Sequence, residues 1–425
     1  MTSQAASRPA RTKAPTSAKE TSAPAAVVTV RRIFAMESTN YFLLLGTTLF
    51  LVAFGLVMVL SSSSIESRAN GGSFFDVFLR QGLYALVGIP LMLLASRMPV
   101  AFWKRMARPA IVIAIALQLL VFSPLGYESG GNRNWITLGP VNAQPSELVK
   151  LALIVWIAFV LSRTESYAND WKRFAVPIGA AALIGIGLVL VGKDLGTAVI
   201  MLFIVFGSLF FAGVSFKYIF TGSAIVTVLG IVFAFGSHSR VQRINAWMYG
   251  CSPDEYWTYC WQPTHGTWAL ASGGIFGVGL GNSKAKWSWL PEADNDYIFA
   301  IIGEELGLIG AVVVLALFVV LAIAFIRIIR SSNDAFARIA TSGVMVWIIG
   351  QSLVNVAVVL GVLPVLGVPL PLISAGGSAL ISSLLAIGVV LSFARNQSPR
   401  AEGPVEQTPA ERSRLAAAER TRTRS

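Results

Sequence analysis

The chain has 425 residues, of which 55% are hydrophobic and only 13% are charged, and its formal net charge is +12. A soluble domain carries roughly 25% charged residues, so this composition excludes an ordinary soluble enzyme. Long apolar runs alternate with short polar links, which is typical of a polytopic membrane protein.

Much of the positive charge lies at the two ends of the chain. Residues 1–36 contain six Lys or Arg and one Glu, and residues 395–425 contain seven Arg and four Glu. Both ends are rich in Ala, Ser, Thr and Pro, so we expect disordered basic tails at 1–40 and 396–425. Aromatic residues are not interleaved with these charges, which favours anionic lipid over nucleic acid as the partner. The first apolar run begins at Tyr41, too late for a cleavable signal peptide.

The apolar runs between the tails predict an all-α domain at 41–395 with ten transmembrane helices. We expect these helices at residues 41–60, 78–96, 109–123, 146–162, 174–192, 195–213, 217–236, 297–326, 339–362 and 379–395. An even number of spans puts both termini on one side. Four basic links share that side, which the positive-inside rule makes cytoplasmic. They are 97–108, 163–173, 213–217 and 327–338. The largest link on the opposite, extracytoplasmic side is 237–296, between the seventh and eighth helices.

The first polar cluster is "SGGNRNWITLGPVNAQPSELVKLALI", at residues 129–154. Arg133 lies in a predicted outer link beside an aromatic residue, which suits a pyrophosphate or lipid headgroup; the alternative is a solvated loop residue. Glu147 and Lys150 are three apart and share a helix face. They form either a structural ion pair inside the bundle or a direct contact to substrate.

The second cluster is "GKDLGTAVI", at residues 192–200. Lys193 and Asp194 occupy a link so short that only a tight hairpin between two helices fits. Asp194 either caps the helix that follows, through its side chain, or forms a charged wall of an outer cavity.

The third cluster is the 237–296 link. It contains Cys251 and Cys260, the two cysteines of the chain. Both face an oxidising compartment, which favours a disulfide, whereas two thiols alone make a poor zinc site. The glycines between 273 and 281 lack the context of a phosphate loop and favour close backbone packing. Lys286 follows them, near a group of carboxylates.

That group is the stretch "LPEADNDYIFAIIGEELG", at residues 290–307, which holds five of the 21 acidic residues of the chain. Carboxylates at a membrane border cost free energy unless they are solvated, form ion pairs or have a functional role. A helix that begins near Asn295 would place Asp296 in its first turn, where capping is one reading. Glu304 and Glu305 lie two turns deeper, so we expect an internal hydrogen-bonded network for them.

The fourth cluster is "GVLPVLGVPLPLISAGGSALISS", at residues 361–383. Its four prolines predict non-helical backbone that is buried in protein or lines a cavity. Hydroxyl and amide groups gather just before the last helix, which predicts an anion site; the alternative is a helix break required by packing. The residues of this predicted site are Ser374, Gly376, Gly377 and Ser378.

These four clusters, in this order, resemble the signatures of the SEDS family (shape, elongation, division and sporulation proteins) across residues 41–395. The block "KWSWLPEADNDYIFAIIGEELG" is more similar to the cell-division member than to the elongation member. There are departures: Asp294 and Asn295 stand where the family usually has His and Thr. Ala375 and Ala379 replace a usual Tyr and Ser.

The resemblance implies an inverting peptidoglycan glycosyltransferase that polymerises lipid II during septal wall synthesis, with Asp296 as the general base. Cations would meet the pyrophosphate: Arg133, Lys150 or Lys286, or a divalent Mg or Mn, with Arg240 and Arg243 as weaker candidates. The resemblance implies no permanently bound cofactor or metal site.

The implied setting is the plasma membrane at the division septum, with a class B penicillin-binding protein and other divisome proteins as partners. Three alternatives stay open: a lipid II flippase, an elongation-type member, and a division scaffold that acts through its tails.

Overall fold

The structure of the chain is a computed structural model. It describes residues 38–69, 71–129, 131–139, 141–164, 171–236, 238–253, 255–287 and 289–395. The prediction of disordered tails at 1–40 and 396–425 falls outside these residues, apart from residues 38–40.

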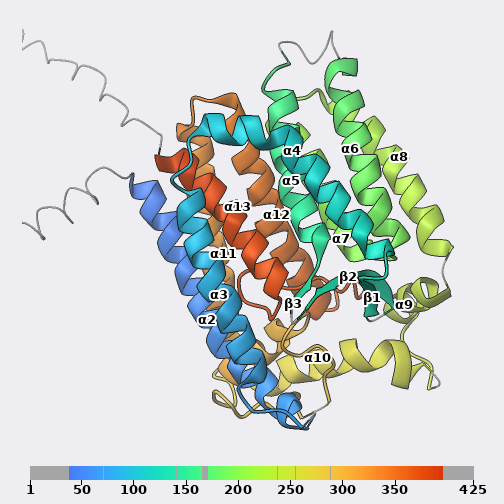
Figure 1. The fold of residues 1–425 in the computed structure, drawn as a ribbon. Coiled ribbons are helices and arrows are strands. Elements are labelled where there is room, and N and C mark those ends of the chain that lie inside the picture. Colours follow the sequence, from blue (N-terminus) through green and yellow to red (C-terminus); the bar gives the residue numbers. More distant parts are fainter. Residues whose placement is uncertain are drawn as a thin grey trace, which may run out of the picture. The chain divides into compact units, whose positions relative to one another are not determined.

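Ten long helices form a bundle within the described residues, and each overlaps one of the predicted ranges (Figure 1). They are α2 (Thr39–Ala69), α3 (Asp76–Ala95), α4 (Val100–Leu119), α5 (Pro145–Leu161), α6 (Trp171–Val191), α7 (Leu195–Phe211), α8 (Phe216–Phe235), α11 (Ile298–Ser331), α12 (Ala335–Val359) and α13 (Gly377–Arg395). In the described part of the chain, seven helices are long and apolar enough to cross a membrane. The multi-pass prediction is therefore confirmed, whereas the number of ten spans stays a prediction.

The third predicted helix is longer than expected. α4 begins at Val100 and contains Pro109, which the sequence placed at its start. The predicted basic link 97–108 is therefore mostly helix. Its charges are compatible with a helix end because they find partners outside the apolar core: Lys104 Nζ lies 2.6 Å from a carboxylate oxygen of Asp334.

The prediction of an all-α fold is wrong for residues 126–143. They form a three-stranded antiparallel sheet of β1 (Gly126–Ser129), β2 (Asn132–Leu138) and β3 (Val141–Ala143) in the order β1-β2-β3. Tyr127 pairs with Trp135, and Thr137 pairs with Asn142. Aromatic and β-branched residues favour such a pleated surface, although Gly, Asn and Pro around them are typical of a loop. A short 3₁₀ turn, η1 (Leu120–Phe122), joins α4 to this sheet.

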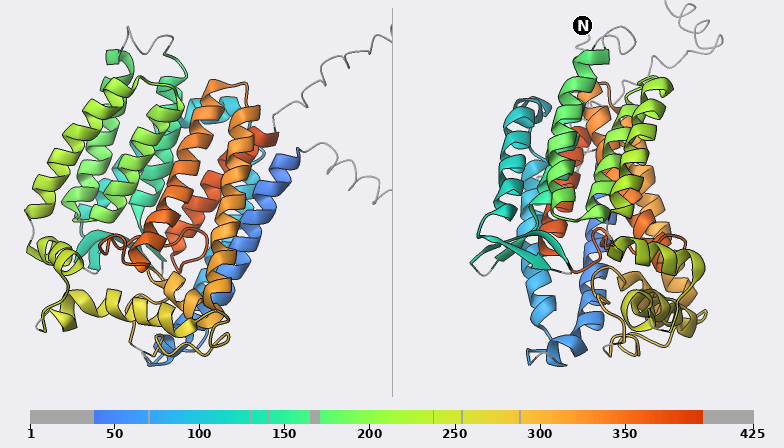
Figure 2. Two further views of the ribbon diagram at one scale, coloured as in Figure 1. Left: turned by 180° about the vertical axis from the view of Figure 1, so that it is seen from behind. Right: turned by 90° about the vertical axis from the view of Figure 1, so that its right-hand side faces the viewer.

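The predicted 237–296 link also contains helices. They are α9 (His238–Tyr249), the π-helical turn η2 (Tyr256–Cys260) and α10 (Trp261–Gly273). Figures 1 and 2 show the sheet, α9 and α10 at the same end of the bundle, where α10 runs across the helix axes. We call this the loop end. Its assignment to the extracytoplasmic side stays a prediction.

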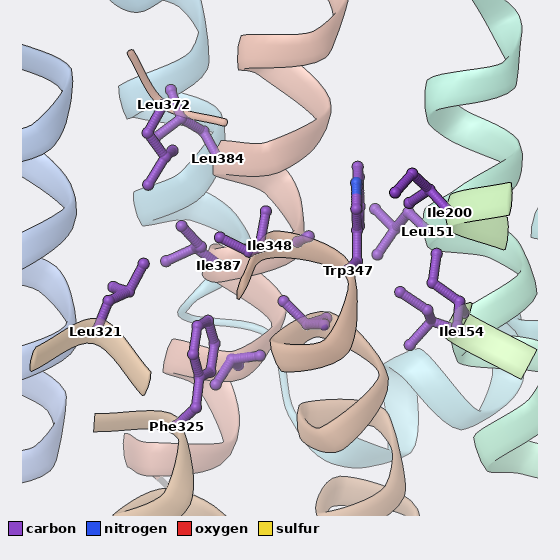
Figure 3. Close-up of a cluster of buried hydrophobic side chains, with 14 of the residues drawn as sticks. Leu151, Ile154, Ile200, Leu321, Phe325, Trp347, Ile348, Leu372, Leu384 and Ile387 are labelled. Atoms are coloured by element: carbon purple, nitrogen blue, oxygen red, sulfur yellow. The ribbon is translucent and has the colours of Figure 1, made fainter. Parts of the chain in front are cut away.

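The apolar side chains separate into a packed interior and an outer surface. In the interior, Trp347 and Ile348 of α12 lie between side chains of α5 and α11 (Figure 3). On the outside, α8 exposes large apolar side chains that a soluble protein would bury, as expected for contact with lipid. They include Phe216, Phe220, Ile225, Val228 and Val232.

The backbone of α11 is interrupted at Gly307, where φ is 68° and ψ is −167°. The glycine run that follows α10 packs against this break. Leu308 N donates to Gly274 O at 2.9 Å, and a side chain on Gly277 would clash with the Glu305 carbonyl oxygen. These glycines thus permit close backbone packing, as predicted.

Candidate active site at the loop end

Asp296 lies in the stretch that leads into α11, and neighbouring backbone holds this stretch in place. Because α11 begins at Ile298, after the N-cap Tyr297, Asp296 precedes the helix and does not cap it. The carbonyl groups of residues 294–296 each accept a hydrogen bond. Their donors are the Ala375 amide (2.8 Å), Ser374 Oγ (2.7 Å) and Asn355 Nδ2 (2.8 Å), in that order.

The carboxylate of Asp296 is half-buried and accepts no hydrogen bond from the described residues. Desolvation by burial raises its pKa to about 7, and the negative charges of Glu292, Asp194 and Asp294 add to this effect. The guanidinium of Arg243 acts in the opposite direction. A carboxyl group with a pKa near the working pH is suited to accept and release protons.

A cavity of about 370 Å³ has three cations and one carboxylate, Glu128, in its lining, and we call it the cation-lined cavity. Asp296 does not belong to this lining, but Arg243 does, and its charge acts on the Asp296 carboxylate. Lys193 comes from the link between α6 and α7, and Arg240 and Arg243 come from α9. Leu366 also lines the cavity, and the next residue is Gly367, with φ of 68°. A Cβ atom at Gly367 would lie 3.5 Å from Asp296 Oδ2, so Gly367 connects this carboxylate to Leu366 of the cavity wall.

A second cavity, of about 220 Å³, adjoins the first and shares Arg243, Pro364 and Val365 with it. A disulfide joins Cys251 to Cys260 in its wall. The two cavities together place α9 over the segment between α12 and α13.

Residues 360–376 connect α12 to α13, and we call them the return segment. This segment lines the cation-lined cavity, as the sequence predicts. Three buried amide side chains satisfy its backbone. Gln81 binds Ser374 O and the Gly376 amide, at 3.0 and 3.1 Å, and Gln351 donates to Pro369 O at 2.8 Å. Asn355 donates to Val368 O at 2.7 Å. The sequence interpretation missed these three amides, although polar groups inside apolar helices are a recognisable signal.

The predicted anion site before α13 uses its polar groups internally. Ser374 Oγ donates to Asn295 O, and the Gly376 amide donates to Gln81. Ser378 Oγ accepts a hydrogen bond from the Gln144 amide, and the ring of Tyr84 fills the space at Gly377. These contacts favour the alternative of a helix break required by packing.

Glu147 and Lys150 are buried together. Lys150 Nζ lies 2.8 Å from Glu147 Oε1, donates to Gln351 Oε1 at 3.1 Å, and sits 4.8 Å from the ring centre of Trp347. This geometry favours a structural ion pair, one of the two readings of the sequence.

Asp194 caps α7, because its carboxylate accepts from the Thr197 amide at 2.9 Å and from Gln144 Nε2 at 3.2 Å. Burial raises the pKa of Asp194. Its neighbour Lys193 lines the cation-lined cavity, so this short link both caps a helix and contributes to a cavity wall.

Arg133 is exposed and connects the sheet to the end of η1. Its guanidinium donates to Val121 O at 3.1 Å and to Ser123 O at 3.2 Å. The neighbouring Gly131 and Asn132 line the cation-lined cavity, whereas the cavity lining does not include Arg133.

Lys286 is buried in an ion pair with Glu305, at 3.2 Å, and donates to Gly281 O at 2.6 Å. Glu304 accepts hydrogen bonds from the Ser283 hydroxyl and the Lys284 amide. The predicted internal network of Glu304 and Glu305 is therefore present. Lys286 belongs to this network and does not line the cation-lined cavity.

The sequence predicts a divalent cation that accompanies the pyrophosphate. In the part of the chain that the structure describes, no three His, Cys, Asp or Glu side chains are grouped to hold a metal ion. A metal ion that enters with its pyrophosphate ligand stays a prediction.

The fold and the site define a multi-pass membrane protein whose titratable and cationic groups gather at one end of a helical bundle. The family model described as cell cycle protein, named for FtsW, RodA and SpoVE, matches residues 41–399. The chain belongs to this family, which confirms the resemblance carried by its four motifs.

Curated relatives match over most of the chain. It is 36% identical over 360 residues to the probable peptidoglycan glycosyltransferase FtsW of Mycobacterium tuberculosis, covering 84% of this chain and 68% of the relative. It is 37% identical over 358 residues to the protein of the same name from Coxiella burnetii, covering 82% and 94%. The similarity to the cell-division member is thus confirmed.

Solved structures share the fold. A chain of a peptidoglycan synthase complex that coordinates polymerization and crosslinking superposes with a TM-score of 0.68 at 26% identity, covering 83% of this chain and 97% of that chain. The rod shape determining protein RodA of Thermus thermophilus gives a TM-score of 0.62 at 26% identity, covering 84% and 97%.

Proposed function

We propose that this protein is a peptidoglycan glycosyltransferase that polymerises lipid II at the outer face of the plasma membrane during septal wall synthesis. The names of its relatives support the activity. The observation that carries the proposal is the Asp296 carboxylate, which has no hydrogen-bond partner among the described residues, has a pKa near neutrality and feels the charge of Arg243 from the cation-lined cavity.

Asp296 acts as the general base. It takes the proton from the 4-hydroxyl of the acceptor N-acetylglucosamine as that oxygen attacks the anomeric carbon of the donor N-acetylmuramic acid. The bond from this carbon to the pyrophosphate oxygen breaks with inversion, and undecaprenyl pyrophosphate leaves with the electron pair. A positioned base contributes typically about 10²–10⁴-fold in rate.

The departing pyrophosphate gains negative charge, so cations must face it. Lys193, Arg240 and Arg243 line one cavity and suit this role better than Lys150 and Lys286, which are buried in ion pairs. Arg133 keeps a structural role in this proposal. A Mg or Mn ion bound to the pyrophosphate would add to the same positive field.

The polymerase works with a class B penicillin-binding protein, which supplies crosslinking. The solved synthase complex that coordinates polymerization and crosslinking supports this pairing. We place the loop end outside the cell, both termini in the cytoplasm, and the protein at the septum with other divisome proteins.

The function is tested with the purified protein and its cognate partner in liposomes. We expect labelled lipid II to be converted into glycan strands, resolved on a gel. Movement of labelled lipid II across the bilayer without any glycan would contradict the proposal and identify a flippase. For the septal role, a fluorescent fusion should gather at division sites, and depletion should give undivided filaments; lateral-wall localisation would indicate an elongation-type member.

A further inference from the structure

A third cavity, of about 270 Å³, includes Asp294 in its lining, two residues before Asp296. The end of α2 and the start of α3 form its walls. Asp294 belongs to this lining, whereas the carboxylate of Asp296 lies next to Gly367, the residue that follows Leu366 in the wall of the cation-lined cavity. The full lining consists of Ser63, Glu66, Ser67, Gly72, Asp76, Val77, Arg80 and Asp294. We call it the carboxylate-lined cavity.

Several polar side chains of this cavity have no side-chain partner among the described residues. The side chains of Glu66, Arg80 and Asp294 form no ion pair or hydrogen bond with side chains that the structure describes. Ser67 is only 9% exposed, and its hydroxyl has no hydrogen-bond partner among the same residues. An unsatisfied buried hydroxyl costs free energy, so it is an expected contact point for a ligand.

The net charges of the two linings differ in sign. Three carboxylates outnumber Arg80 in the carboxylate-lined cavity, whereas three cations outnumber Glu128 in the cation-lined cavity, so a pyrophosphate favours the latter. Carboxylates accept hydrogen bonds from sugar hydroxyl and N-acetyl N–H groups. The Arg80 guanidinium donates to carbonyl or carboxylate oxygens, such as those of an attached peptide.

We infer that the carboxylate-lined cavity is the subsite for the phosphate-free end of the acceptor saccharide, which it holds so that the acceptor hydroxyl reaches Asp296. This inference rests on the proposed function. The donor pyrophosphate then occupies the cation-lined cavity, and the tripeptide 294–296 separates the two substrates. Asp294 is a specificity-determining contact of the acceptor in this arrangement.

The direct test is binding of a disaccharide pentapeptide that carries no phosphate and no prenyl chain, with the purified full chain in detergent. We expect saturable binding by calorimetry or saturation-transfer NMR. Asp294→Asn and Glu66→Gln should each weaken it about tenfold, the loss expected for one good hydrogen bond. Glu255→Gln is the matched control, because this half-buried carboxylate of the same loop end lies outside the cavity.

Polymerisation kinetics separate this inference from the proposed function. Glu66→Gln should raise the KM for the acceptor and leave the affinity for undecaprenyl pyrophosphate unchanged. Arg240→Ala should weaken the affinity for undecaprenyl pyrophosphate and leave the KM for the acceptor unchanged. If wild-type protein makes glycan but binds no phosphate-free disaccharide peptide, or if Glu66→Gln and Asp294→Asn bind it like wild type, the subsite is wrong and the function stands. Binding lost in these two variants supports the subsite even where no glycan forms.

Discussion

The pH dependence of polymerisation follows from the surroundings of Asp296. Its pKa of about 7 lies well above the ordinary aspartate value, because burial and neighbouring carboxylates disfavour its charged form. A base works only when it is ionised, so the rate should rise with pH through about 7 and level off above it. About half of the molecules are ionised at pH 7 and about one-tenth at pH 6, which predicts a loss of rate of about fivefold over that unit.

Two substitutions should move this midpoint in opposite directions. Arg243→Gln removes the positive charge that lowers the pKa of Asp296, so the midpoint should move to higher pH. Asp294→Asn removes a negative charge that raises it, so the midpoint should move to lower pH. Lys104→Gln is the control, because Lys104 pairs with Asp334 at the opposite end of the bundle and should leave the profile unchanged.

The assay is the initial rate of glycan formation from saturating lipid II between about pH 5.5 and 8.5. A wild-type profile that stays level down to about pH 5.5 would refute the reasoning, because it would require a base with an ordinary pKa. Shifts of the same sign in the Arg243 and Asp294 variants would also refute it.

Three further predictions concern stability. Lys286→Met leaves the buried Glu305 without its ion-pair partner and should lower the free energy of unfolding by about 3–5 kcal/mol. Thermal unfolding in detergent measures this change, and an unchanged transition temperature would show that the pair is not buried. Gln81→Leu removes two hydrogen bonds to the return segment and should cost about 1–3 kcal/mol in the same assay, whereas a neutral effect would contradict its bracing role. Replacing Cys251 and Cys260 together by Ser opens a short ring worth about 2–3 kcal/mol, so limited proteolysis of the 237–296 region should accelerate; equal cleavage rates would contradict this.

The sequence predicts the helices well because the membrane imposes a strong constraint: a span needs about 20 apolar residues. The polar motifs at 129–154, 192–200 and 361–383, which the sequence marks as unusual, all contribute residues to the cation-lined cavity. The sequence does not predict the sheet at 126–143, because short strands among Gly, Asn and Pro resemble a loop. The sequence also does not predict the start of α4 at Val100, because the charged residues in the first turns of this helix resemble a polar link between helices.

The partners of individual charged side chains cannot be predicted from the sequence. Lys286 and Arg243 are both cations of the same link, yet Lys286 pairs with Glu305 in the interior and Arg243 lines the cavity. Nothing in their local sequence separates them, since tertiary packing alone decides which cation is buried. The same holds for Asp294 and Asp296, two residues apart: Asp294 lines the carboxylate-lined cavity, whereas the Asp296 carboxylate lies next to Gly367.

The most direct measurement compares wild-type protein with Asp296→Asn in lipid II polymerisation, with the crosslinking partner present and saturating substrate. The substitution keeps the size of the side chain and removes its ability to take a proton. We predict a loss of about 10²–10⁴-fold in kcat with an unchanged melting temperature. Glycan formation by Asp296→Asn at a rate near that of wild type would contradict the assignment of this carboxylate as the general base.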